Sequence, residues 1–244
     1  MIIDLQKVKL PKKISPCPIL EGVVEFRFES SFPHDAIFGI VYNELKKDYP
    51  NLQELPILQL PEVVRSQDPN LRHKPYYRLM SEDKKYLFQV GARVFSLINL
   101  NPYDGWSAFS EKLKNLIERM NKISIVDTYT RVGIRYINGF DINILKKINL
   151  YLGIEKNHLV DLDTTIRLEV PSGDYTNTLQ VINNARVKKD GEVSKGSIVD
   201  IDTFIENPKK EIFDIIEEAH LAEKKLFFTL LKDEFIKKEL NPEY

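Results

Sequence analysis

Three arginines on two strand-like segments have the clearest potential for chemistry in this chain. Arg27 lies in a run of alternating apolar and charged residues, and Arg131 and Arg135 lie four residues apart in a second such run. Because residues two or four apart share one face of a strand, these arginines are expected on the polar face. They predict a site for a phosphate or carboxylate anion. The alternative is cross-strand pairing with the glutamates Glu25, Glu29 or Glu169.

Two Asp-x-Asp pairs, Asp161/Asp163 and Asp200/Asp202, could hold a metal ion, and the second is the better candidate because Val199 and Ile201 alternate with its acids. Asp200 and Asp202 flank an isoleucine, so on a strand their carboxylates would share a face. Oxygen ligands of this kind suit Mg²⁺ or Ca²⁺. The alternative is an ordinary solvated strand face. We predict no other cofactor.

The remaining candidates for ligand or partner binding are aromatic or polar. Tyr103 and Trp106, the only tryptophan, lie where a strand leads into a helix, and they can form a stacking platform. The alternative is that Trp106 holds the helix against the sheet. Tyr136 and Asn138, next to Arg135, complete the set.

The common catalytic motifs are absent from the sequence. No histidine has the spacing of a metal or catalytic motif, and there is no nucleophile elbow, phosphate-binding loop or dinucleotide fingerprint. His220 and Glu223, three residues apart on a predicted helix, are expected to form a surface pair. These absences favour a binding protein over an enzyme.

The composition is that of an ordinary globular protein. Of 244 residues 43% are hydrophobic and 29% charged, and the formal net charge of −1 argues against a nucleic-acid-binding body. Cys17 is the only cysteine, which fits a reducing compartment. Neither a signal peptide nor a membrane-spanning run is evident. We therefore expect a cytoplasmic protein without membrane contact.

Periodicity places the elements of the first half. Residues 1–18 read as an N-terminal arm. Strands are predicted over 22–29, 76–81, 85–90 and 93–100, and helices from Pro33 to Tyr49 and over 106–122. Between them, the proline density of 50–75 predicts a loop without a regular helix or central strand.

The second half repeats this plan. We predict strands over 128–137, 164–170, 177–183 and 197–204, a helix over 141–152, a turn at Asp190-Gly191 and a long final helix over 209–238.

An internal match indicates duplication. The first strands of the two halves align in one register, with Arg27 on Arg135. The full set of matched pairs is Val24/Val132, Phe26/Ile134, Arg27/Arg135, Phe28/Tyr136 and Phe32/Phe140.

The predicted fold is α+β, with a single domain over 19–244 made of two pseudo-symmetric β-α-β-β-β-α repeats, 19–123 and 127–239. They would form one curved, mainly antiparallel sheet of about eight strands with helices on one face. This arrangement is similar in shape to TBP-like or helix-grip-like folds, and the analogy implies no DNA binding.

Several motifs resemble those of a known family. They include Pro18-Ile19-Leu20-Glu21 before Glu25-Phe26-Arg27-Phe28, and Tyr103-Asp104-Gly105-Trp106 followed by Phe109. The most specific is Arg131-Val132-Gly133-Ile134-Arg135-Tyr136-Ile137-Asn138. The chain is therefore similar to a family of sporadically distributed prokaryotic proteins that has no established activity. The resemblance implies a prokaryotic, cytoplasmic protein and supplies no catalytic residues; the family's arginine after Asn138 is Gly139 here.

Two functions follow as hypotheses. The first is a non-enzymatic binding or accessory module that engages a protein partner through an open sheet face or groove, and a neighbouring gene is the first candidate to encode that partner. The alternative is a metal-dependent or phosphate-directed enzyme acting on nucleotides or nucleic acid. An open sheet also leaves edges through which a homodimer can form.

Overall fold

The computed structural model describes residues 9–189 and 192–244. Its strands are β1 (Ile19–Glu29), β2 (Asn51–Glu54), β3 (Tyr77–Met80), β4 (Tyr86–Val90), β5 (Val94–Leu100), β6 (Thr128–Phe140), β7 (Gly153–Ile154), β8 (Asn157–His158), β9 (Thr165–Ser172), β10 (Tyr175–Lys189) and β11 (Glu192–Glu206). Its helices are α1 (His34–Leu45), α2 (Glu62–Gln67), α3 (Trp106–Ile123), α4 (Ile212–Leu230) and α5 (Asp233–Glu239), with 3₁₀ turns at Pro56–Gln59 and Ile144–Lys146. The turn predicted at Asp190-Gly191 and the first part of the predicted arm lie outside the described residues.

Nine of these strands form one mainly antiparallel sheet in the order β2-β3-β4-β5-β1-β6-β11-β10-β9, and β7 pairs with β8. The predicted α+β class is confirmed at this level. Strands β2, β7 and β8 were not predicted, and β2 pairs antiparallel with β3 at one end of the order. None of the described helices has the length and apolar character that a membrane span requires.

The chain divides into two compact units. The first unit comprises residues 22–133 and 205–216, and the second comprises 134–204 and 217–244 with the described part of the N-terminal segment up to Glu21. These units are defined by how densely their residues contact one another. The repeats 19–123 and 127–239 were predicted from sequence similarity, and they stay a prediction.

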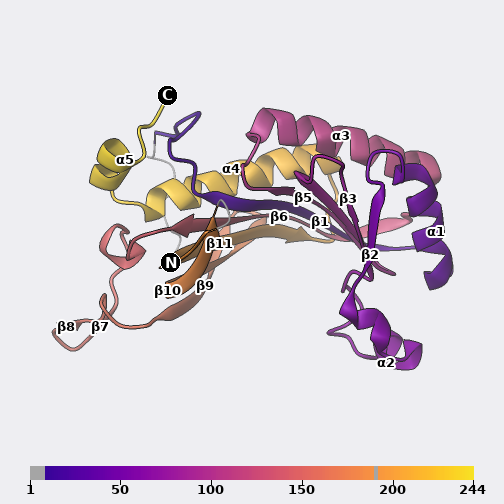
Figure 1. Ribbon diagram of the computed structural model, residues 1–244, viewed down its shortest axis with the longest axis horizontal. Coiled ribbons are helices and arrows are strands. Elements are labelled where there is room, and N and C mark those ends of the chain that lie inside the picture. The colour runs from indigo at the N-terminus through magenta and orange to yellow at the C-terminus, as the bar shows by residue number, and fades with distance from the viewer. Residues whose placement is uncertain (1–8, 190–191) are drawn as a thin grey trace. The chain divides into compact units, whose positions relative to one another are not determined.

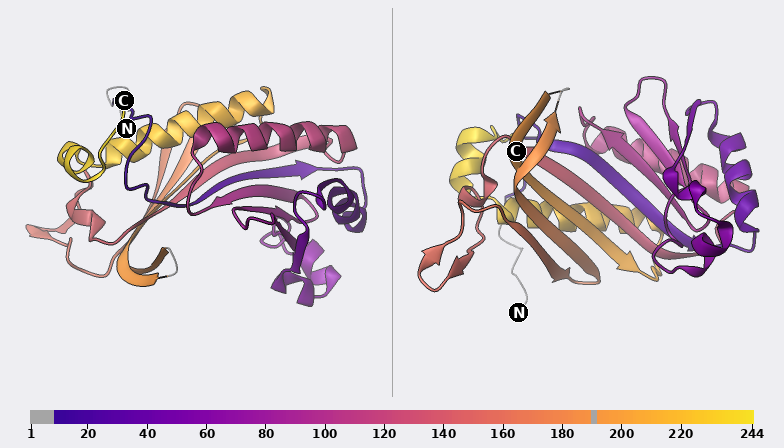
Figure 2. Two further views of the ribbon diagram at one scale, coloured as in Figure 1. Left: turned by 45° about the horizontal axis from the view of Figure 1, so that its top comes forward. Right: turned by 60° about the horizontal axis from the view of Figure 1, so that its bottom comes forward.

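The first unit has an aromatic core beneath α3. Alternation in β1 buries Phe26 and Phe28 completely, and both rings lie against Phe95 of β5, at centroid distances of 4.7 and 5.6 Å. α3 turns its apolar stripe toward the same face, where Phe109 meets Tyr86 of β4. α2 lies on the opposite side of these strands (Figures 1 and 2). One face of β1 therefore packs in the core under α3. Its other face is turned toward the segment that contains α2.

The second unit packs α4 and α5 on one face of its strands. Residues Leu179 and Val181 of β10 and Val199 and Ile201 of β11 join the apolar side chains of α4 and α5 in one cluster. The intervening residues of these strands face the other way. Figure 2 (right) shows that face of β9, β10 and β11 with α4 behind it. The second unit thus has a helix-covered face and an open face.

The helix predicted over 141–152 is wrong. Only a 3₁₀ turn forms, at Ile144–Lys146, where the Asn143 side chain accepts a hydrogen bond from the Leu145 amide. Ile148 then forms an isolated β-bridge with Leu231. The apolar residues of this segment, Ile144 among them, are buried as expected, but the backbone bonds that would continue a helix go to distant partners.

Two further element predictions need correction. The final helix is not continuous over 209–238, because Leu231 takes part in the β-bridge to Ile148 and separates α4 from α5. The proline-rich segment 50–75 does contain a helix, α2, which begins directly after Pro61. Proline fits before a helix because its fixed φ and missing N–H cost nothing there.

Candidate functional site

A network of arginines and glutamates lies on the polar face of β1 in the first unit. Glu25, Arg27 and Glu29 alternate with the buried phenylalanines, as predicted. Arg27 donates from Nε to Glu25 Oε1 at 2.8 Å, and Arg131 of β6 donates from Nη1 to the same oxygen at 3.1 Å. Arg131 is largely buried, with 9% of its side chain exposed, whereas 35% of Arg27 is exposed. The structure therefore brings two of the three predicted arginines together around one carboxylate.

Glu29 is the second carboxylate of this network. Arg72, from the segment after α2, donates to Glu29 Oε1 at 2.6 Å, and Arg93 Nε lies 3.7 Å from Glu29 Oε2. Arg93 also donates to the carbonyl oxygens of Ala92 and Ser30 at 2.8 and 3.0 Å. Each of the three guanidinium nitrogens of Arg93 therefore has a partner. Arg72 is half exposed, and within the described residues its ion pair is with Glu29.

His73 lies at the edge of this network. Its Nδ1 is 3.3 Å from the Arg93 carbonyl oxygen. Burial lowers the pKa of His73 below its usual 6.5, and the nearby Arg27 and Arg72 charges lower it further. At neutral pH the ring is therefore uncharged. Arg27 and Arg72 are the more exposed guanidinium groups of this network, and exposed guanidinium groups suit the oxygens of an anion.

The third predicted arginine, Arg135, belongs to the second unit. It donates from Nε to Asp200 Oδ1 at 2.8 Å and from Nη2 to Oδ2 at 2.6 Å, a bidentate pair between β6 and β11. Asp200 is 12% exposed and Arg135 45%. The Asp200 hydrogen bond raises the pKa of Arg135. The sequence predicted either an anion or one of three glutamates as the partner of Arg135. Asp200, 65 residues away, was not among them.

This pair belongs to a charged row across the open face of the second unit. The strand registers place Gln180 of β10 opposite Asp200 and Arg167 of β9 opposite Gln180. The next row holds Asp202, Thr178 and Glu169 in the same way. The middle of the open face therefore carries polar residues and charges of both signs, and the bidentate pair fixes Arg135 against Asp200.

The predicted metal site at Asp200 and Asp202 shares this surface. Both carboxylate oxygens of Asp200 accept hydrogen bonds from Arg135. Over residues 9–189 and 192–244, no cluster of three or more histidine, cysteine, aspartate or glutamate side chains is arranged to hold a metal ion. A metal would have to displace Arg135, and the site stays a prediction.

Tyr136 and Asn138, two of the predicted binding residues, are buried in the single chain. Both are 2% exposed. The Tyr136 hydroxyl lies 3.3 Å from His220 Nδ1, and Asn138 donates to the Val199 carbonyl oxygen at 3.2 Å. Their positions in β6 support the strand and its contact with α4.

Tyr103 and Trp106 pack around the start of α3. Each ring meets Phe109 edge-on, with centroid distances of 6.1 and 6.2 Å, and Phe109 is completely buried. Both aromatic residues are half-buried. This geometry corresponds to the structural alternative, in which Trp106 holds the helix against the strands.

Two titratable groups on α4 escaped the sequence reasoning. The predicted surface pair of His220 and Glu223 is wrong, because Glu223 is only 4% exposed. Burial raises the pKa of Glu223 to about 8, although the positive charge of Lys224 favours a lower value. Burial also lowers the pKa of His220 to about 3, assisted by the Lys224 charge. The sequence did contain a sign of this burial, because Glu223 lies between Ala222 and Leu226 on the apolar stripe of the helix.

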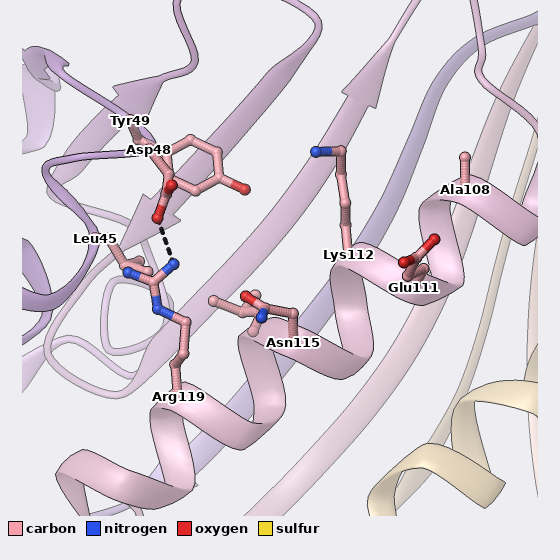
Figure 3. Close-up of a pocket in the computed structure, with 9 residues that line it drawn as sticks. Leu45, Asp48, Tyr49, Ala108, Glu111, Lys112, Asn115 and Arg119 are labelled. Carbon is pink, nitrogen blue, oxygen red and sulfur yellow. Dashed lines mark hydrogen bonds and ion pairs between the residues drawn. The ribbon is translucent and has the colours of Figure 1, made fainter.

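A cleft of about 400 Å³ lies between the end of α1 and α3 in the first unit. Figure 3 shows Arg119 of α3 reaching Asp48, and their Nη1 and Oδ2 atoms are 2.5 Å apart. Arg119 also donates to Glu44 of α1 at 3.0 Å. Two turns before Arg119 on the same helix, Lys112 lies over the Tyr86 ring at 4.6 Å. The ion pairs of Arg119 with Glu44 and Asp48 therefore connect α3 to α1 and the residues after it.

Comparisons with known proteins identify no family. No family model matches the chain, and no curated protein matches it, so the resemblance drawn from its motifs stays a prediction. Among solved structures it is similar to the duplicated taurocyamine kinase from Schistosoma mansoni. The substrate-free form is 12% identical with a TM-score of 0.44, and the form with bound transition state analog components is 13% identical with a TM-score of 0.45. The match covers 93% of this chain but only 35% of the kinase chains.

Proposed function

We propose that this chain is a non-enzymatic binding module that engages a protein partner through the open face of β9, β10 and β11. The observation that carries the proposal is the row of polar residues, with charges of both signs, in the middle of a sheet face whose other side is packed by α4 and α5. Ordered charges on a rigid sheet favour recognition of a complementary protein surface, because they select orientation and exclude wrong partners.

The test is affinity capture from native cells with matched variants. Thr178→Arg places a long cation at the centre of the open face, and Leu221→Arg places the same residue on the exposed side of α4. We expect the wild type and Leu221→Arg to retain one protein that Thr178→Arg loses. Equal capture by all three, or recovery of a partner-free chain that turns over a small substrate, would refute this function.

A second candidate, a phosphate-directed enzyme acting on nucleotides or nucleic acid, is favoured by the exposed guanidinium groups beside Glu25 and Glu29. Arg27 and Arg72 are the exposed members of that network, and bidentate guanidinium groups suit phosphate oxygens. In this reading pyrophosphate or a nucleotide raises the melting temperature of the wild type, and Arg27→Ala abolishes the shift. A Mg²⁺- or Mn²⁺-dependent shift lost in Asp202→Asn would add the predicted metal. No shift under any of these conditions removes the candidate.

We also propose that the chain is an internal duplication with a TBP-like or helix-grip-like plan. The strand order supports it: β5, β4 and β3 follow outward from β1 as β11, β10 and β9 follow from β6. α3 follows β5 as α4 follows β11. In this scheme the short turn Ile144–Lys146 replaces α1. An experimental structure tests it, because one rotation must superpose Phe26 and its surroundings on Ile134 and its surroundings.

A further inference from the structure

Strand β9 ends the sheet order and presents an open edge. It pairs with β10 on one side, and no described segment pairs with its other side. Most of its residues are exposed, including Leu168 at 39%. Such an edge offers unpaired backbone donors and acceptors to another strand.

The hairpin geometry identifies which residues of β9 point to that edge. Gly173-Asp174 forms the turn and Ser172 pairs with Tyr175, so hydrogen-bonded pairs recur at every second residue from Ser172. The bond from the Asn183 amide to the Thr164 carbonyl oxygen, at 2.9 Å, has the same parity. The backbone groups of Thr165, Arg167, Glu169 and Pro171 therefore point outward.

Pro171 agrees with this assignment. Proline has no N–H to donate, so within a sheet it is tolerated where that group would face an open edge. The outward backbone groups of Arg167 and Glu169 thus form a usable row, and their side chains share the open face of the sheet. Leu168 lies between them on the helix-covered face, opposite the buried Leu179.

We propose that β9 pairs antiparallel with β9 of a second copy of this chain, around a twofold axis at Leu168. In this register Arg167 lies opposite the partner's Glu169, and Glu169 lies opposite the partner's Arg167. The two Leu168 side chains meet at the axis in a non-hydrogen-bonded pair, where strands approach most closely. A leucine that is exposed in the single chain is thereby covered.

Charge selects this register over its neighbours. Moving the axis to Arg167 sets two arginines opposite each other, and moving it to Glu169 sets two glutamates opposite each other. Like charges at directly opposed positions destabilise a strand pair. Within the described residues, neither Arg167 nor Glu169 forms an ion pair, so both are available to a second copy. In many sheets, charged residues on an edge strand block pairing with another strand. In β9 the two charges are of opposite sign and lie on either side of Leu168, so an antiparallel second copy places attractive pairs opposite each other.

The test is charge reversal followed by sedimentation velocity over a wide concentration range. Arg167→Glu sets glutamate against the partner's Glu169, and Glu169→Arg sets arginine against the partner's Arg167. Each reversal should weaken dimerisation by roughly tenfold, because two symmetric attractions become repulsions. The double swap, R167E with E169R, should restore the dimer, and an equimolar mixture of the two single variants should form heterodimers.

Lys156→Glu, on the exposed turn between β7 and β8, is the matched control and should dimerise like the wild type. Circular dichroism establishes that each variant is folded, and the mixture of single variants reads out pairing even if one is less stable. A wild type that remains monomeric throughout, or a dimer that neither single reversal weakens, would overturn the proposal. Its outcome is independent of partner capture through the open face.

Discussion

Replacing Glu223 by glutamine tests whether an ionisable carboxyl is buried on α4. Glu223 is 4% exposed, and burial raises its pKa from 4.5 to about 8. Between these values the folded protein keeps a proton on Glu223 that the unfolded chain has released. Unfolding therefore releases a proton, and the free energy of unfolding falls as pH rises through this window.

The magnitude follows from the two pKa values. One pKa unit corresponds to about 1.4 kcal/mol, so the whole window is worth roughly 4 to 5 kcal/mol. Between about pH 5 and pH 8 the loss amounts to roughly 3.5 kcal/mol. Glutamine has nearly the same shape and does not ionise. Its buried amide costs about 1–3 kcal/mol at every pH, and this cost cancels when two pH values are compared.

The assay is urea denaturation followed by far-ultraviolet circular dichroism at these two pH values. Relative to the wild type, Glu223→Gln should gain roughly 3.5 kcal/mol more at about pH 8 than at about pH 5. Glu111→Gln, at an exposed position of α3, should show almost no such difference. If the effect of Glu223→Gln is the same at both pH values, the carboxyl is not neutral in the folded protein and the reasoning fails.

His220 acts in the opposite sense and shapes the same curve. Its folded pKa is lowered from 6.5 to about 3, so the unfolded chain binds a proton that the folded protein does not. Stability from this group is complete above pH 6.5 and is lost as pH falls toward 3. In Glu223→Gln the free energy of unfolding should therefore rise up to about pH 6.5 and then level off. In the wild type the two contributions oppose each other between pH 4.5 and 6.5, and the free energy of unfolding should fall above about pH 6.5.

Other changes follow from single contacts and are measured by urea denaturation. Thr203→Val removes the hydroxyl that donates to Asn177 Oδ1 at 2.5 Å, and leaving that buried oxygen unpaired should cost about 1–3 kcal/mol; an unchanged stability would mean that water replaces the donor. Gly91→Ala should cost about 1–3 kcal/mol, because its Cβ would clash with the Lys74 carbonyl oxygen. Gly39→Ala, in α1 with open space around the new methyl, should be neutral or stabilising by up to about 1 kcal/mol. Equal effects of the two alanines would contradict the packing around Gly91.

Local pattern predicted the elements whose periodicity agrees with their packing. α3 was expected over 106–122 and spans Trp106–Ile123, because its apolar stripe is long and uninterrupted. The strand expected over 22–29 lies within β1 for the same reason. The segment 141–152 failed because its buried residues take backbone partners far along the chain, as Ile148 does with Leu231. A window of local sequence does not contain those partners.

The site illustrates the same limit. Alternation placed Arg27 and Arg131 on the polar face, and they do converge on Glu25. The choice of Asp200 for Arg135 depends on which strand lies beside β6, and this is a property of the whole sheet order. The burial of Glu223 could have been predicted from its place on the apolar stripe of α4. It was not predicted, because charged helix residues are usually exposed.

The two ends of the strand order connect the proposed duplication with the proposed dimer. In the duplication β9 corresponds to β3, and the outer side of β3 is covered by the short antiparallel strand β2. The second half has no described counterpart of β2, so the equivalent side of β9 is open. An antiparallel β9 from a second copy would occupy the position that β2 holds beside β3. If duplication is correct, one half covers its edge with its own chain, and the other half is left to cover it by self-association.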